Sequence, residues 1–139
     1  MSEFALREAR PGDIEGLLAL WRATQSGPSV TDTPDHLAMV IEEAGDLFLV
    51  AESDGRLAGS VLGGWDLWRG QISRLAVHPD FQRQGIARAL LQAVEGRLRQ
   101  RGARRVHAIA FNREAAIGFW SASGYARSDA VVFLRTLHE

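Results

Sequence analysis

The sequence contains no cysteine, and all of its 16 basic residues are arginine. Without cysteine, the chain can form no disulfide, no cysteine-based zinc site and no thiol nucleophile. It also lacks an apolar run of about 18 residues, so we expect neither a membrane span nor a membrane partner. The first residues lack the basic and then apolar order of a signal peptide, which makes a cytoplasmic location the expectation.

Length and composition are those of one soluble domain, which we expect to cover residues 1–139, with 46% hydrophobic and 24% charged residues. Four histidines are spread along the chain without metal-ligand spacing, so we expect no metal. A pI near 6.4, with no basic stripe interleaved with aromatics, argues against nucleic acid as a partner. A homodimer stays open, because homodimers are common among soluble oligomers.

Charge is distributed unevenly along the chain. Residues 1–66 carry twelve acidic residues against four arginines, whereas residues 67–139 carry five acidic residues against twelve arginines. Two explanations are open. The halves could pack together and neutralise each other, or the second half could hold an anionic ligand while the first half faces a cationic one.

Apolar residues recur at helical spacing in four segments. Asp13 and Thr33 are candidate N-caps for the first two helices, and Pro34 suits the first position of the second. The helices are expected to begin near Asp13, Pro34, Gly85 and Asn112, and the last three to end at Gly45, Gly102 and Gly124.

Six further segments read as strands: 4–8, 47–53, 56–68, 71–77, 105–111 and 125–137. Asp54-Gly55 predicts a tight hairpin turn after the second strand. Gly59, Gly63 and Gly64 predict bends or close backbone approach in the third. The fourth and fifth strands, joined by a helix, should be parallel neighbours. We therefore expect a mixed sheet covered by helices.

Residues 71–88 carry the clearest chemical signal, because a strand runs through a loop into a helix that opens at Gly85. The first N–H groups of a helix have no internal partner, and together with the macrodipole they favour an anion. Gly85 has no Cβ to block a ligand, Ala87 is small, and Arg83 and Arg88 add positive charge. The segment predicts a phosphate or pyrophosphate site.

The alternative is an ordinary surface helix that begins at a glycine. A nucleotide P-loop is excluded, because it needs a lysine and a serine or threonine at the start of the helix. The dinucleotide fingerprint Gly-x-Gly-x-x-Gly is absent as well.

Two motifs give the chain a resemblance, over nearly its whole length, to the GNAT superfamily of acetyl-CoA-dependent N-acetyltransferases. The first is Leu75-Ala76-Val77-His78-Pro79 followed by Gln82-x-x-Gly85-x-Ala87. The second is Asn112-x-x-Ala115 followed by Phe119-Trp120 and Gly124-Tyr125. The resemblance implies an α/β fold of the α+β type. Its mixed, mostly antiparallel sheet would have six to seven strands, about four flanking helices and a central βαβ acyl-CoA-binding unit.

The resemblance also implies which residues contact acetyl-CoA, the co-substrate. Residues 75–77 would pair with the pantetheine arm like an added strand, and the Val77 amide would polarise the thioester carbonyl. Residues 82–88 would hold the pyrophosphate, while Asn112 and Phe119 would line the far side of the arm. The predicted contacts are Leu75, Ala76, Val77, Gln82, Arg83, Gln84, Gly85, Ile86, Ala87, Arg88, Asn112 and Phe119.

Two positions depart from the family pattern, so the catalytic residues stay unassigned. Trp120 stands where the family often has a tyrosine acid, and Gln71 stands where some members have a glutamate base. An unassisted thiolate costs about 2 kcal/mol at pH 7, whereas deprotonating an alkylamine costs about 4–5 kcal/mol. The missing base is therefore the larger gap.

Other candidates for proton transfer or acceptor binding have structural explanations that we prefer. Asp66, Glu52 and His107 would be solvated or structural, and Tyr125 would pack as an aromatic. Trp65 and Trp68 cannot face the same side of a regular strand. One of the two could line an acceptor pocket, with core packing as the alternative.

The sequence thus predicts an N-acetyltransferase that transfers acetyl from acetyl-CoA to a primary amine of a small molecule or protein. Asp32, Asp35 and Asp66 are candidates to attract a cationic amine. The alternative is a non-catalytic acyl-CoA-binding module of the same fold, because Gln71 and Trp120 replace the usual base and acid.

Overall fold

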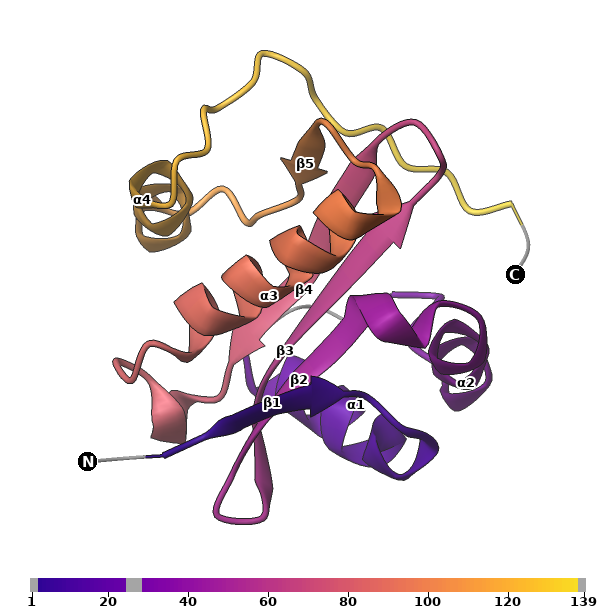
Figure 1. Cartoon of the computed structure of the whole chain (residues 1–139), viewed down its shortest axis with the longest axis vertical. Helices are drawn as coiled ribbons and strands as arrows, with labels where there is room; N and C mark the ends of the chain where they lie inside the picture. The colour runs from indigo at the N-terminus through magenta and orange to yellow at the C-terminus, as the bar shows by residue number, and fades with distance from the viewer. Residues whose placement is uncertain (1–2, 25–28, 138–139) are drawn as a thin grey trace. The chain divides into compact units, whose positions relative to one another are not determined.

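The structure, a computed structural model, describes residues 3–24 and 29–137 (Figure 1). It divides into one compact unit over Met1–Ala108 and a second over Ile109–Glu139. Among the described residues, no helix combines the length and apolar character needed to cross a membrane.

The first unit is built on one sheet with strand order β1-β2-β3-β4-β5. Its strands are β1 (Ala5–Glu8), β2 (Phe48–Ser53), β3 (Arg56–Trp65), β4 (Gly70–Val77) and β5 (Val106–Ala108). Neighbours are antiparallel except β4 and β5, which are parallel, as the predicted crossover requires. The mixed sheet with its βαβ unit is therefore confirmed.

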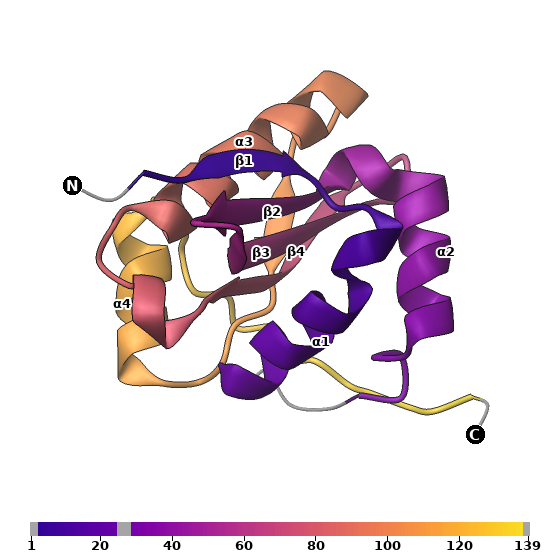
Figure 2. The same ribbon diagram turned by 90° about the horizontal axis from the view of Figure 1, so that it is seen from below.

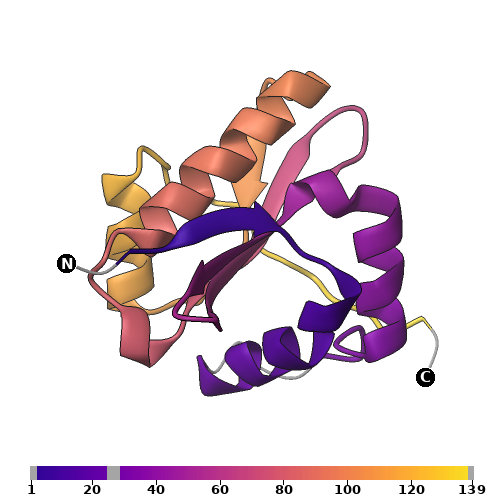
Figure 3. The same cartoon turned by 60° about the horizontal axis from the view of Figure 1, so that its bottom comes forward.

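Three helices cover the two faces of this sheet. Figure 2 and Figure 3 show α1 (Ile14–Ala23) and α2 (Pro34–Ala44) on one face and α3 (Ile86–Arg101) on the other. The core under α1 and α2 includes Leu17 and Trp21 packed against Phe48, which is fully buried. The central strands therefore have both faces buried, between one layer of helices on each side.

The two predicted N-cap residues precede the first two helices, but only Thr33 caps its helix with its side chain. Thr33 caps α2, because its hydroxyl accepts from the His36 N–H at 3.2 Å. Asp13 precedes α1, yet its carboxylate accepts from the Arg10 N–H at 2.9 Å and so closes the 3₁₀ turn Pro11–Asp13. The Asp13 side chain thus fixes the entry to α1 rather than its first turn.

Two glycines of β3 allow α3 to lie directly on the sheet. A Cβ at Gly59 would come within 2.9 Å of the Ala76 carbonyl oxygen and 3.0 Å of Ile86. A Cβ at Gly63 would come within 2.8 Å of Val94, whereas one at Gly64 would have 3.8 Å of room. The predicted close approach holds at Gly59 and Gly63 but not at Gly64.

The strand number is the main error of the prediction, because the sheet has five strands and not six to seven. Residues 125–137, expected as a last strand, contain no strand, and Phe133 and Leu134 are 89% and 90% exposed. The fifth strand shortens to β5, Val106–Ala108. Strand propensity alone was misleading, because a strand forms only where its peptide groups find a paired neighbour.

The second unit contains α4 (Glu114–Ala122), close to the predicted range. After α4 the chain turns at Gly124, whose φ of 92° suits a residue without a Cβ. The Trp120 ring meets the Phe119 ring edge-on at 5.6 Å and the Tyr125 ring at 4.8 Å, so Tyr125 packs as an aromatic, as preferred above.

Candidate functional site

Strand β4 bends in its middle and leaves β5. Its register with β3 slips between the pairs Leu62–Ser73 and Ser60–Ala76, so β4 holds one extra residue there. Arg74 lies in this bulge with a φ of 54°, a left-handed conformation that non-glycine residues rarely adopt. Pairing with β5 covers only Gly70–Ile72, so beyond the bulge the outer edge of β4 has no strand partner among the described residues.

The direction of the peptide groups after the bulge follows from one hydrogen bond. The His78 N–H donates to the Ala58 carbonyl of β3 at 2.8 Å. Because peptide groups alternate along a strand, Ala76 also faces β3, whereas the peptide groups of Leu75 and Val77 face the outer edge. Two of the three predicted arm-binding residues thus offer N–H and C=O groups at a strand edge, and the Ala76 peptide group does not.

A buried chain of hydrogen bonds holds the bulge. The Trp21 Nε1–H donates to Ser60 Oγ at 2.9 Å, and the Ser60 hydroxyl donates to the Arg74 carbonyl at 2.8 Å. Ser60 is fully buried and Trp21 is 3% exposed, with the Trp21 ring stacked on Phe48 at 6.2 Å. The conformation of Arg74 is therefore fixed from the core of the sheet.

The Arg74 side chain also contacts Trp21. Its guanidinium carbon lies 4.7 Å from the centre of the Trp21 ring, and its Nη2 donates to both carboxylate oxygens of Asp32 at 2.8 Å. These two charged side chains are mostly buried, at 19% and 12% exposed. Arg74 thus joins the bulge to the connection between α1 and α2, and Asp32, a predicted amine-binding residue, is already neutralised.

The loop after β4 leads directly into α3. It contains the 3₁₀ turn Pro79–Phe81, and both Arg83 and Gly85 have positive φ, at 65° and 81°. Gly85 is the N-cap of α3, and no side chain within residues 3–24 or 29–137 caps the helix. A Cβ at Gly85 would meet nothing within 4 Å, so the space above this residue is open. The start of α3 therefore has the unpaired donors and the open approach of an anion site.

The side chains of this loop divide into two sets. Gln82, Arg83 and Arg88 are exposed, and neither arginine forms an ion pair in the part of the chain that the structure describes. Ile86 packs into the core at 1% exposed, and Gln84 Oε1 is buried and has no hydrogen-bond partner among the described residues. A ligand at this loop would meet the arginines and the backbone rather than Ile86 or Gln84 Oε1.

The proton-transfer candidates near the sheet are mostly engaged. Hydrogen bonds from the Arg69 and Trp68 N–H groups hold the pKa of Asp66 below its ordinary value, so Asp66 organises its own turn. Glu52 accepts from Arg7 Nε at 2.9 Å. His107 differs, because it is exposed on β5.

His107 lies beside Gln71 in the sheet, since the parallel register of β4 and β5 pairs the two residues. Side chains paired in this way point to the same face of a sheet. The nearest β3 residue in the register is Gly64, which has no side chain to cover them. The imidazole therefore occupies an open face beside the position where the family can carry a base.

Ion pairs between the halves account for part of the charge asymmetry. Three of them join acidic residues before position 67 to arginines after it: Arg74–Asp32 at 2.8 Å, Arg97–Glu8 at 2.6 Å and Arg101–Asp46 at 2.6 Å. Mutual neutralisation thus explains these arginines, while Arg83 and Arg88 stay available to an anionic ligand.

The site residues fall in both units. Leu75 to Arg88 are consecutive in the first unit, whereas Asn112 and Phe119 belong to the second. Asn112 is exposed, and Phe119 packs on Trp120. Sequence reasoning missed the supporting group of Trp21, Ser60 and Arg74. The one feature of the sequence that could have indicated this group is Ser60, a serine in the middle of an otherwise apolar strand.

Comparison with known proteins agrees with this geometry. The model of the acetyltransferase (GNAT) family matches residues 14–125. An acetyltransferase of Pectobacterium atrosepticum is 34% identical over 135 residues, which cover 96% of each chain. The crystal structure of PaiA N-acetyltransferase from Thermoplasma acidophilum, in complex with coenzyme A, has a TM-score of 0.80 at 18% identity and covers 93% of each chain. Ard1 from Thermoplasma volcanium has a TM-score of 0.79 at 22% identity, over 90% of this chain and 84% of its own. The chain belongs to the GNAT family of acetyltransferases.

Proposed function

We propose that this protein transfers an acetyl group from acetyl-CoA to a primary amine of a small molecule or protein, by direct attack of the amine on the thioester. One observation carries the proposal: among the described residues the outer edge of β4 beyond the bulge has no strand partner, and a short loop connects it to the uncapped start of α3. A ligand with a peptide-like arm and a pyrophosphate matches this order of groups. The coenzyme A complex of the PaiA neighbour supports it.

The β4 edge would hold the acyl arm. The pantetheine arm contains amide groups, which can pair with the peptide groups of Leu75 and Val77 as an added strand does. An N–H on this edge, at Val77 or at Leu75, would donate to the thioester carbonyl as negative charge develops on its oxygen. Removing one such preorganised donor from an enzyme costs about 10²–10³ in kcat, so the fixed bulge matters for rate.

The loop would hold the pyrophosphate. The N–H groups of Ile86, Ala87 and Arg88 form the first turn of α3, where the helix dipole favours an anion. Arg83 and Arg88 would add charge-assisted contacts, because both are exposed. Asn112 and Phe119 of the second unit stay proposed contacts of the arm.

The acceptor must lose a proton before or during attack, and Gln71 cannot take it. His107 is the titratable neighbour of Gln71 in the register and would accept the proton through water. The leaving thiolate needs less help, because its cost at pH 7 is about 2 kcal/mol. Trp120 can donate no proton to it, so we propose that solvent does.

The attraction of a cationic amine would not rest on Asp32 or Asp66. Asp32 is paired with Arg74, and Asp66 accepts two backbone N–H groups. Asp35, exposed in the first turn of α2, stays a candidate. We therefore propose that orientation at the β4 edge, rather than a strong charge contact, selects the acceptor.

The second candidate function is an acyl-CoA-binding module without turnover. Gln71 and Trp120 favour it, because neither side chain can transfer a proton. A thiol-release assay with acetyl-CoA and a panel of alkylamines, α-amines and peptides distinguishes the two functions. Release of coenzyme A that depends on the amine supports the transferase, whereas tight acetyl-CoA binding without release for any amine supports the module.

A further inference from the structure

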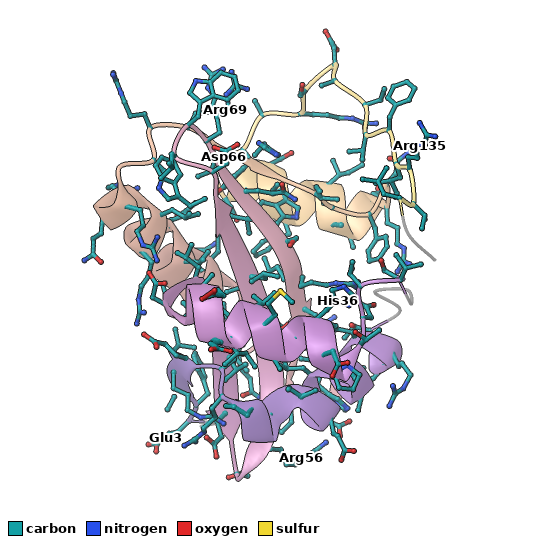
Figure 4. The ribbon with its side chains drawn as sticks, turned by 90° about the vertical axis from the view of Figure 1, so that its right-hand side faces the viewer. Glu3, His36, Arg56, Asp66, Arg69 and Arg135 are labelled. Atoms are coloured by element: carbon teal, nitrogen blue, oxygen red, sulfur yellow. The ribbon has the colours of Figure 1, made fainter. Side chains whose placement is uncertain are left out.

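The hairpin between β3 and β4 ends in an exposed apolar tip, residues 66–69. Leu67 is 85% exposed and Trp68 is 72% exposed. Figure 4 shows Asp66 and Arg69 at this end of the sheet, far from Arg56 at the other. Adjacent large apolar side chains that remain exposed to solvent are typical of a surface that contacts another molecule.

Two hydrogen bonds to one carboxylate oxygen close the turn at this tip. Asp66 Oδ1 accepts from the Trp68 N–H at 2.9 Å and from the Arg69 N–H at 2.7 Å. Leu67 has a φ of 77°, which is strained for a residue with a Cβ. The turn thus maintains the strained Leu67 and leaves both Leu67 and Trp68 exposed, and strain of this kind is found where it serves a function.

Arginines surround the tip. The Arg69 guanidinium lies over the Trp68 ring at 4.3 Å. Beside the tip is a hollow of about 420 Å³, which Trp68 and Arg69 line together with Arg104 and Arg105. In the described part of the chain, none of these three arginines forms an ion pair. A partner for this surface must therefore bring negative charge as well as an apolar group.

The hollow is remote from the proposed acetyl-CoA loop. Gly102, the C-cap of α3, lines the hollow, whereas Gly85 is the N-cap at the other end of the same helix. The 16 residues of α3 span about 24 Å, at 1.5 Å a residue. The pyrophosphate site and the hairpin tip can thus be occupied independently.

We propose that residues 66–69, with Arg104 and Arg105, bind an acidic segment of a partner protein that inserts an apolar or aromatic side chain beside Trp68. The arginines would pair with its carboxylates, and the Trp68 ring would cover its apolar group. Aromatic and arginine side chains together are the residues that most often dominate the energy of a protein interface.

Other occupants fit this surface less well. A nucleic acid would need a longer basic surface, and the chain has a net charge of -1. A second copy could offer the acidic residues of α2, but that contact would join two different surfaces. Contacts of this kind form filaments unless a ring closes. An acidic peptide needs only the small hollow and the three arginines present.

The test is fluorescence anisotropy with a labelled peptide that alternates glutamates with two phenylalanines. Its controls are the same peptide with glutamine for glutamate, the peptide with serine for phenylalanine, an oligothymidylate, and phosphatidylserine vesicles. Protein variants are Trp68→Ala, Arg104→Gln with Arg105→Gln, and Arg22→Gln as a matched exposed arginine on α1. Acetyl-CoA binding and thermal unfolding are measured for each variant.

We expect the acidic phenylalanine peptide to bind the wild type. Binding should weaken at least about tenfold in Trp68→Ala and in the double arginine variant, and should stay within about twofold in Arg22→Gln. Acetyl-CoA binding should be unchanged in all three. The proposal is overturned if the peptide does not bind, if the glutamine or serine peptide binds equally well, or if the oligothymidylate or the vesicles bind more tightly. If the wild type does not bind acetyl-CoA, that result counts against the proposed function and not against the peptide site.

Discussion

Arg74 and Trp21 hold each other in two ways at the centre of the sheet. The guanidinium carbon lies 4.7 Å from the centre of the indole ring, and the indole N–H reaches the Arg74 carbonyl through the Ser60 hydroxyl. The left-handed conformation of Arg74 costs about 1–2 kcal/mol in a residue with a Cβ. These contacts offset that cost and keep the outer edge of β4 open for a ligand.

The Ser60→Ala variant should lower turnover more than coenzyme A affinity. It leaves the buried Trp21 N–H without an acceptor, which should cost about 1–3 kcal/mol in the free energy of unfolding. A looser bulge misplaces the β4 donors, so kcat should fall about tenfold or more while the coenzyme A Kd changes little. Steady-state kinetics and calorimetric titration with coenzyme A measure the two effects.

Ser53→Ala is the matched control for that experiment. Ser53 is also buried, at 4% exposed, and its hydroxyl donates to the Glu3 carbonyl at 2.9 Å, away from the bulge. We expect it to lower stability without lowering kcat in molecules that stay folded. Equal losses of kcat in the two serine variants would show that Ser60 has no special role at the bulge.

The Arg74–Asp32 pair should be energetically coupled. A double-mutant cycle with Arg74→Ala and Asp32→Ala, measured by urea unfolding, should give a coupling of about 1–3 kcal/mol, because both groups are mostly buried. The exposed pair Arg56–Asp80, also at a short distance of 2.9 Å, is the comparison and should couple more weakly. Similar couplings for the two pairs would mean that burial of the first contributes nothing.

A methyl group at Gly59 should disrupt the packing of α3 against β3. Gly59→Ala places a Cβ 2.9 Å from the Ala76 carbonyl oxygen, so β4 or α3 must move, at a cost of about 1–3 kcal/mol in unfolding free energy. Gly64→Ala, with 3.8 Å of room on the same strand, is the control and should unfold like the wild type. Urea unfolding of both variants checks this, and a tolerated Gly59→Ala would contradict the described packing.

The Arg7–Asp13 pair should make stability depend on pH. Hydrogen bonds from Arg7 at 2.7 and 2.9 Å, then one from the Arg10 N–H, hold the pKa of Asp13 below its ordinary value of 3.8. Because the pKa is lower in the folded state, this stabilisation is present above about pH 4 and is lost as the pH falls toward the folded value.

The Asp13→Asn variant measures that contribution. At pH 7 it should unfold with a free energy about 1–3 kcal/mol lower than the wild type. The difference should shrink as the pH is lowered below 4, since protonated Asp13 resembles asparagine. A difference that stays constant from pH 7 to pH 2.5 would show that the Asp13 charge is not what Arg7 stabilises.

Local sequence signals predicted the parts of the fold that depend on neighbouring residues. Asp54-Gly55 forms the predicted turn, with φ of 53° and 73°. Thr33 caps α2, and Gly85 and Gly102 bound α3 as expected. In each case a single residue type has a conformational or hydrogen-bonding property that few others share, so the sequence alone is informative.

The features that depend on distant partners could not be predicted in this way. Nothing in the residues around Arg74 indicates a positive φ, because Ser60 and Trp21 impose it from other elements. The same limit explains the missing last strand. Val131 to Leu134 favour a strand locally, yet the structure shows no pairing partner for them among its described residues.

The most direct test of the central claim is a calorimetric titration of acetyl-CoA into the wild type, Gly85→Glu and Gly55→Glu. The two glycines are matched, because each has a positive φ, 81° and 73°, and each has open space where a Cβ would lie. Both substitutions therefore strain the backbone alike, but only Gly85→Glu places a carboxylate at the start of α3. We predict that the wild type and Gly55→Glu bind acetyl-CoA and that folded Gly85→Glu does not. Equal binding by both variants, or no binding by the wild type, would contradict the acetyl-CoA site.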